Sequence, residues 1–413
     1  MKVFELFKAG LMTCLAWTLA VPAALAQTAA DMPAEDYSID SARIHNMYVG
    51  VRNMNFIKDN EFSGSVMKGY TLPGLWIQPS VKYYPLSNVK LELGLHALIY
   101  DGAIKYPNFA YQDIAVWKGA QYQRGAHLLP MFRAQVGLGN VNLVWGTLYS
   151  GASHGLMTPL YDPELNFSAD PDLGFQVLVD TRRVHLDAWI NWQSFVFRLS
   201  DHQEAFTVGL SMRTWLNSEN RRLRWYIPVQ LLAQHRGGEI IDTEQRQVRT
   251  LMNGAVGVGT EWYAGRGLLR KFGAEAAVLG YYQQSGTLWP FDSGAAAYVT
   301  ASAQLGHYFN VRLGYFHGRK FISMYGLPYF GCVSMKNEGS TYDGMTTVFG
   351  SVEYRRQVAK GFALGVWGDI YETHPGKMTA PDGTVGGAGS ATNFAFGAYF
   401  RVDFDFHVWN ARK

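Results

Sequence analysis

The feature of this sequence that most limits its fold is an alternation of apolar and polar residues over unusually long stretches. The clearest example lies near the end of the chain, where apolar residues occupy every second position from Phe394 to Val408. The intervening positions include Arg401, Asp403 and Asp405. A period of two places successive side chains on opposite faces of a β-strand. The pattern therefore predicts a strand with one apolar and one charged face, about twice as long as most strands of globular proteins.

The same period recurs along the chain and predicts about sixteen strands, a number within the range of outer-membrane barrels. The links alternate in length, because 57–73 is long, 85–88 is short, 101–126 is long and Gly139-Asn140 is short. Antiparallel strands with tight turns at one end and long loops at the other are typical of an outer-membrane barrel. We therefore expect an all-β fold, a transmembrane up-and-down antiparallel β-barrel of about 16 strands. The expected strands lie near 46–56, 74–84, 89–100, 127–138, 141–149, 173–180, 184–197, 205–216, 222–234, 250–262, 270–282, 295–305, 308–318, 345–356, 361–372 and 393–408.

Composition excludes two other classes of protein. Hydrophobic residues make up 48% of the chain and aromatic residues 15%, which is too much apolar surface for a disordered polypeptide. Only Ala9 to Ala26 forms a long apolar run, so the rest of the chain is not a helical membrane protein. A soluble periplasmic β-protein would also show alternation. Strands of about ten residues fit an apolar band about 25 Å tall, which favours the barrel, with its charged face lining a water-filled lumen.

The N-terminus has the pattern of an export signal. Lys2 and Lys8 precede the apolar run, which ends in Ala24-Leu25-Ala26, the small-x-small pattern of a signal peptidase site. We expect cleavage after Ala26. The expected organisation is a signal peptide at 1–26, a periplasmic N-terminal segment at 27–44, the outer-membrane barrel at 45–409 and a C-terminal tail at 410–413.

Charge and cysteine content exclude several kinds of partner. The formal net charge is +3 and no basic block is present, so we expect no nucleic-acid partner. Cys332 is the one cysteine that follows the apolar run. The mature chain is therefore expected to have no intrachain disulfide and no cysteine-based metal site.

On its strand pattern, the chain resembles a bacterial outer-membrane porin-like β-barrel, similar to uncharacterised outer-membrane proteins of the Bacteroidota. The resemblance covers 45–409 and implies outer-membrane lipid and the barrel-assembly machinery as partners. Two features depart from the pattern. The chain continues for four residues after Trp409, whereas such barrels usually end on an aromatic residue. Proline also occurs inside three expected strands, at Pro79, Pro130 and Pro228, where we expect a bulge or a strand end.

Charged residues on the polar faces of the expected strands are candidate pore-lining groups. If the loop 150–172 folds into the lumen, its carboxylates would face wall arginines and select solutes by charge. Mutual neutralisation across neighbouring strands, and a solvated loop, are the simpler interpretations, which we favour. No Asp-x-Asp-x-Asp-Gly spacing supports a calcium site. The candidate pore-lining residues are Arg213, Arg224, Glu275, Arg312, Glu353, Arg355, Arg401 and Asp403, and the candidate loop constriction is Asp162, Glu164, Asp170 and Asp172.

A serine–histidine motif invites comparison with outer-membrane phospholipases. Ser150, Ser153 and His154 occur within Tyr-Ser-Gly-Ala-Ser-His-Gly. A catalytic pair needs the histidine within hydrogen-bond reach of the hydroxyl. Adjacent residues of a strand point to opposite faces, so Ser153 and His154 cannot pair if the strand continues. We therefore interpret His154 as a polar loop residue.

The positions of the tryptophan residues also bear on the expected barrel. Most of them fall near expected strand ends, as in the aromatic girdles of a barrel. Trp189, Trp215 and Trp367 fall instead on the polar face. Indoles there would either stack on sugar rings in a solute path or pack behind a lumenal loop.

Together these observations favour an outer-membrane channel for passive passage of small hydrophilic solutes, with no catalytic residues, no metal and no cofactor. Two alternatives stay open. One is a barrel enzyme acting on lipid, with His154 beside a serine at the outer rim. The other is a non-channel barrel whose loops form a receptor or adhesion surface. A filled lumen would favour either alternative, and an open lumen would favour the channel.

Overall fold

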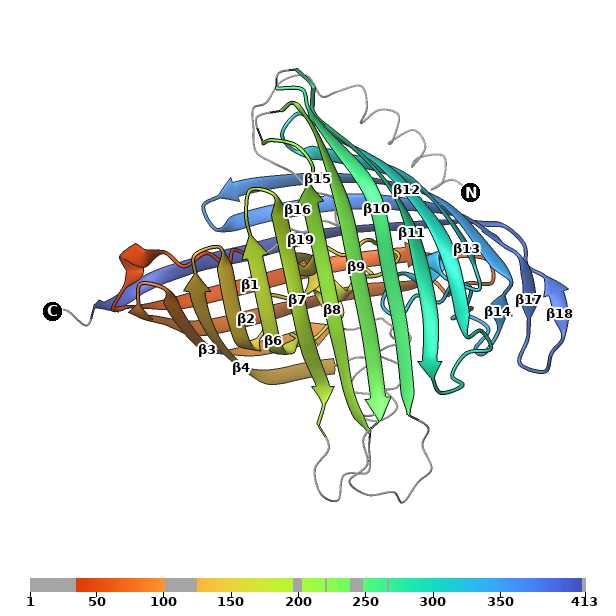
Figure 1. Cartoon of the computed structure of the whole chain (residues 1–413), viewed down its shortest axis with the longest axis horizontal. Coiled ribbons are helices and arrows are strands. Elements are labelled where there is room, and N and C mark those ends of the chain that lie inside the picture. The colour runs from red at the N-terminus through yellow and green to blue at the C-terminus, as the bar shows by residue number, and fades with distance from the viewer. Residues whose placement is uncertain are drawn as a thin grey trace.

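The protein folds as a closed antiparallel β-barrel of sixteen strands (Figure 1). A computed structural model describes residues 35–100, 125–195, 203–219, 221–237, 248–265 and 267–410. The barrel closes where β1 pairs with β19, from Asn46↔Asn410 to Glu61↔Phe394. The expected fold class and strand number are confirmed. In the described part of the chain the wall strands are β1 (Asn46–Glu61), β2 (Tyr70–Leu86), β3 (Val89–Tyr100), β4 (Gly125–Leu138), β5 (Val141–Thr147), β6 (Leu173–Asp180), β7 (Val184–Ser194), β8 (Glu204–Trp215), β9 (Leu223–Gly237), β10 (Arg249–Tyr263), β11 (Leu269–Ser285), β12 (Ser293–Leu305), β13 (Phe309–Arg319), β15 (Gly344–Ala359), β16 (Phe362–Pro375) and β19 (Ala391–Asn410).

Outside the wall, the structure contains only short elements among its described residues. Three small strands form a separate sheet near one rim, and four short helices lie in the connections. No described helix has the length and apolar character needed to cross a bilayer. These elements are β14 (Thr341–Tyr342), β17 (Lys377–Thr379), β18 (Val385–Gly387), η2 (Ser41–Arg43), η4 (Gly151–His154), α3 (Leu165–Ser168) and η5 (Pro328–Phe330).

The two-residue period sets which side chains face outward. On β19, Phe396 and Phe400 are exposed on the outer surface, whereas Ala395 and Tyr399 are buried on the lumen side. A slip of one residue would exchange the two faces and place charged residues in hydrocarbon. The outer surface of the wall is accordingly apolar, as expected for an outer-membrane barrel.

The three prolines lie inside strands rather than at their ends. Pro79 on β2 pairs with Val51 of β1, but the pairing of β2 with β3 is interrupted at Gln78 and Pro79. Pro228 on β9 pairs with Arg213 of β8, and the pairing with β10 is interrupted there. Because proline lacks an N–H, each ladder is broken on one side only. The expected bulge or strand end is therefore replaced, at Pro79 and Pro228, by an interruption of one ladder inside the strand.

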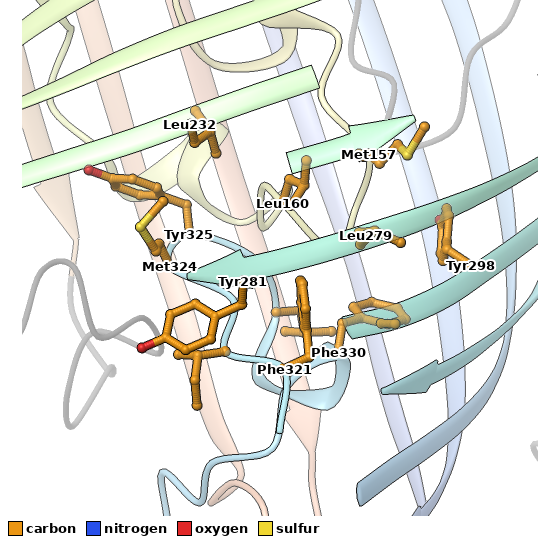
Figure 2. Packing of buried hydrophobic residues seen from close by; sticks show 14 of the residues in the cluster. Met157, Leu160, Leu232, Leu279, Tyr281, Tyr298, Phe321, Met324, Tyr325 and Phe330 are labelled. Carbon is orange, nitrogen blue, oxygen red and sulfur yellow. The ribbon is translucent and has the colours of Figure 1, made fainter. Parts of the chain in front are cut away.

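The lumen is apolar and filled in the half nearest the long loops, in contrast to the expected charged, water-filled channel. The loops 148–172 and 320–343 pack there against inward-facing wall residues such as Leu232, Leu279 and Tyr298 (Figure 2). Phe321 and Phe330 of the second loop are fully buried. These apolar side chains sit on the lumen face because the loops, and not water, are their neighbours.

Charged side chains gather in the other half of the lumen, nearest the short turns. Lys82 of β2 donates to Asp405 of β19 at 2.7 Å, and Arg133 of β4 donates to Glu92 of β3 at 3.2 Å. Residues 35–44, which belong to the expected N-terminal segment, enter this half. Glu35 forms ion pairs there with Arg52 and Arg133. Burial raises the pKa of Glu35, but the two arginines outweigh it and lower that pKa below its ordinary value.

Candidate functional site

The candidate site lies where the loop 148–172 leaves the wall and enters the lumen. The change of direction begins at Gly146, whose φ of 94° is in the region that favours glycine. A Cβ at this position would lie 2.0 Å from the carbonyl oxygen of Phe132. Arg133 stabilises the bend, because its Nε and Nη2 atoms donate to the carbonyl oxygens of Thr147 and Leu148 at 2.7 and 2.8 Å. The sequence thus directs the loop inward.

The loop is anchored to β1 and β2 by a buried carboxylate. Glu164, at the N-terminal end of α3, accepts a hydrogen bond from Lys58 Nζ at 2.7 Å and from the Tyr70 hydroxyl at 2.7 Å. Asp162 lies beside them, and its own burial raises the pKa of its carboxyl group. An ion pair so well buried is expensive to break, since either partner alone would be an uncompensated charge.

His154 is held between two carboxylates at the end of η4. Its Nδ1 donates to Asp187 at 2.8 Å, and its Nε2 donates to Asp172 at 3.2 Å. Burial lowers the pKa of His154, but the two carboxylates outweigh that effect and raise it to about 9. The ring also stacks on Trp189, with centroids 3.6 Å apart. A protonated histidine with both nitrogens engaged cannot accept a proton, so His154 is a structural cation.

A cavity of about 140 Å³ lies between this loop and the wall. Apolar side chains, including Met54, Met131 and Leu232, form part of its lining. His96 of β3 also lines it and is only 2% exposed. The Gln78 amide donates to His96 Nδ1 at 2.9 Å, while His96 Nε2 has no hydrogen-bond partner. With Nδ1 accepting, the neutral ring carries its proton on Nε2.

A second histidine forms a pair with a carboxylate of the loop 148–172. His127 of β4 is buried and its Nδ1 lies 2.8 Å from Asp170 Oδ1. Asp170 itself lines the cavity. A carboxylate that accepts from Nδ1 fixes the orientation and the tautomer of the ring.

The two serines of the motif differ in their environments. Residues 151–154 form the 3₁₀ helix η4 rather than a continuing strand, so the sequence argument against pairing does not apply. Ser153 Oγ nevertheless accepts from the backbone N–H of Glu35 at 3.0 Å. Ser150 lines the cavity and makes no capping hydrogen bond with its side chain. His154 serves neither hydroxyl as a base, because carboxylates occupy both of its nitrogens.

The candidate constriction residues do not form one ring. Asp162 and Glu164 lie beside Lys58, whereas Asp170 and Asp172 bind two different histidines. None of the described residues forms a group of three or more metal-ligand side chains. A role of these acids in selecting solutes stays a prediction.

The candidate pore-lining residues are distributed around the charged half of the lumen. Arg213 lies 3.5 Å from Glu261, and Arg401 lies 2.8 Å from Asp403. Glu275 accepts from the Tyr226 hydroxyl, Arg224 stacks on Trp215, Arg312 donates to Thr158, Glu353 accepts from Tyr399, and Arg355 lies on the lumen side of β15.

Sequence reasoning missed His96 and His127, although a signal for them existed. Both fall on the polar register of neighbouring expected strands, where a histidine must face the lumen. Trp189, Trp215 and Trp367 are likewise buried on that face, packed behind lumenal residues. The partner of His127 could not be found, since Asp170 is 43 positions away within a long loop.

The chain matches the model of one protein family and is similar in fold to many solved barrel structures. A family model described as lipid A 3'-O-deacylase-type matches residues 39–411. No curated protein matches the sequence. Among solved structures, OprD from Pseudomonas aeruginosa is similar at 10% identity over 90% of this chain and 97% of that chain, with a TM-score of 0.42. OccAB4 from Acinetobacter baumannii is similar at 9% identity over 87% and 98%, with a TM-score of 0.46.

The family match corrects one expectation from the sequence. We expected no enzyme, because Ser153 and His154 could not pair on a continuing strand. The matched family is named for an enzyme, a deacylase, and the match spans nearly the whole chain. The likeness to porins extends only to the barrel fold.

Proposed function

Because the chain belongs to the lipid A 3'-O-deacylase-type family, we propose that it is an outer-membrane hydrolase that releases an ester-linked acyl chain from lipid A. The family match carries this proposal. The site at the loop 148–172 supports it, since a partly apolar cavity there is lined by His96 and by Asp170, whose carboxylate binds the buried His127.

The two histidines have complementary roles in this proposal. His127, oriented by Asp170, removes a proton from the water that attacks the ester carbonyl carbon. His96 donates from Nε2 to the carbonyl oxygen as negative charge develops on it. The carbon–oxygen bond to the sugar then breaks, and the proton held by His127 passes to the leaving oxygen. The products are a free fatty acid and a hydroxyl group on lipid A.

The test is a hydrolysis assay with purified protein and lipid A, read by mass spectrometry as the loss of one acyl chain. His127→Ala and Asp170→Asn should each lower the rate about 100-fold or more, the usual contribution of a general base. The chain offers a matched control in His185 and Asp180, a histidine–carboxylate pair 2.6 Å apart beside a short turn.

His185→Ala should leave the rate unchanged, because this pair is half exposed and lies at the opposite rim. Equal rates for wild type, His127→Ala and Asp170→Asn would reject these roles. A folded wild-type barrel that leaves lipid A intact would reject the proposed function.

Passive passage of small hydrophilic solutes is the second candidate. A charged cavity of about 460 Å³ beside the N-terminal segment favours it, since Arg43, Lys82 and Asp405 line a polar space there. The packed loops of the other half oppose it.

A further inference from the structure

Among the described residues, strand pairing in the barrel wall is interrupted beside the cavity. β5 and β6 have 7 and 8 residues, whereas their neighbours β4 and β7 have 14 and 11. Among the described residues, β4 pairs with β5 only over Arg133–Leu138, and residues 125–132 pair with β3 alone. On the other side, β6 pairs with β7 only as far as Gly174↔Asn191. We call this gap in the strand pairing the notch. It lies between β4 and β7, beyond the ends of β5 and β6 that meet the loop 148–172.

The notch exists because the chain turns inward at its floor. The backbone N–H of Leu148 donates to the carbonyl oxygen of Asp172 at 2.9 Å, which is the last rung between these two segments. Residues 149–171 then lie inside the barrel instead of extending the wall. An edge of this length is costly in a membrane, since unpaired backbone groups in hydrocarbon have no partner.

The outer border of the notch is apolar. Leu128 on β4 is 68% exposed and Trp145 on β5 is 66% exposed, and both point away from the lumen. Phe132 packs edge-on against Trp145 with centroids 6.3 Å apart, and Phe175 continues the surface on β6. This border is continuous with the lipid-facing surface of the barrel.

The inner border of the notch is the cavity already described. Met131 of β4, Thr147 at the end of β5, Asp172 before β6 and Asn191 of β7 all line the cavity, so it reaches the notch from each of the four segments. Met131 is 3% exposed and points inward two residues beyond Arg133, where the pairing of β4 with β5 ends. Asn191 donates to Asp172 at 2.5 Å, which places polar groups beside the apolar ones.

We infer that the notch is the lateral entrance through which the acyl chain of an outer-leaflet lipid reaches the cavity from the membrane. The inference rests on the proposed function and adds the route of its substrate. The apolar outer border receives the hydrocarbon chain, Met131 and Leu148 contact it inside, and the polar groups at Asp170 and Asp172 face the headgroup end. Lipid therefore does not have to pass through the packed loops.

Photo-crosslinking tests the entrance directly. The photoreactive residue benzoylphenylalanine is placed singly at Met131 (inside the notch), Leu128 (outside it) and Phe316, a fully buried lumen residue on the continuous wall of β13. Gln193, which lines the cavity from the β7 side, is a second inside position in case the change at Met131 prevents folding. Each barrel is reconstituted in vesicles that contain lipid A with a tagged acyl chain.

We expect tagged adducts at Met131, Gln193 and Leu128 and none at Phe316. An adduct at Leu128 without one at either inside position would overturn the inference, as would equal adducts at Met131 and Phe316. The readout is independent of hydrolysis. Hydrolysis without an inside adduct would reject the lateral entrance and leave the proposed function standing. An inside adduct without hydrolysis would support the entrance and reject the proposed function.

Discussion

At the scale of single residues, the most informative side chain is His154, which the sequence analysis interpreted as a polar loop residue. In the structure it is a buried cation that joins η4 to Asp172 and to Asp187 of β7. Its function follows from geometry, since two carboxylates on opposite ring nitrogens favour the charged form. His154 therefore holds the loop over the cavity.

This role predicts a pH dependence of the loop. The pKa of His154 is about 9 in the folded protein and 6.5 ordinarily, so the stabilisation of about 3 kcal/mol is complete below about pH 6.5. It is lost as the pH rises through 9. Protease cleavage within 148–172 should accelerate between these values in wild type. His154→Gln should be cleaved at a rate that does not change over that range, and a parallel rise in both proteins would contradict the assignment.

At the scale of elements, Gly146 decides where β5 ends and the loop begins. Two conditions apply to this residue, a positive φ and a close approach of the Phe132 carbonyl oxygen. Gly383, between β17 and β18, shares the positive φ but has no atom within 4 Å of an added Cβ. Comparing alanine substitutions at Gly146 and Gly383 therefore separates the cost of backbone strain from the cost of steric overlap.

We expect Gly383→Ala to cost about 1 kcal/mol in the free energy of unfolding, because alanine adopts a positive φ with strain. Gly146→Ala should cost a further 1–3 kcal/mol, about the usual effect of forced overlap in a packed site. Denaturant unfolding followed by tryptophan fluorescence measures both. Equal costs would show that the chain can bend inward without the close contact.

At the scale of the whole molecule, the lumen consists of a packed apolar half and a charged half. The loop 148–172 is fixed in the apolar half by Glu164, which binds Lys58 and Tyr70. A barrel that is closed in this way differs from an open pore even though the strand number is the same. The difference bears on the choice between a lipid hydrolase and a solute channel.

We expect wild-type protein in a planar bilayer to show no steady conductance. Glu164→Ala leaves Lys58 buried without its partner, at a cost of about 3–5 kcal/mol, and should produce transient openings as the loop detaches. Asp382→Ala, in an exposed turn, serves as the control and should remain closed. Steady wild-type conductance would favour the channel instead.

The sequence by itself determined the wall of this protein. The alternation from Phe394 to Val408, and its equivalents along the chain, predicted the sixteen strands and their outward faces. Such a pattern is local, because each strand must turn its apolar face to lipid wherever its neighbours lie. The short turns were predicted for the same reason, as at Gly139, where the positive φ needs only the two flanking strands.

The tertiary structure alone decided what fills the lumen that this wall encloses. Leu279 and Tyr298 face inward although they are apolar, because loops from distant parts of the chain cover them. Asp170 reaches His127 across 43 positions, and Glu164 reaches Lys58 across 106. Such contacts depend on where a long loop is directed, and the period of a strand carries no information about that direction. The pairing of His127 with Asp170 was therefore invisible in the sequence, although the two histidines already lay on the lumen-facing register.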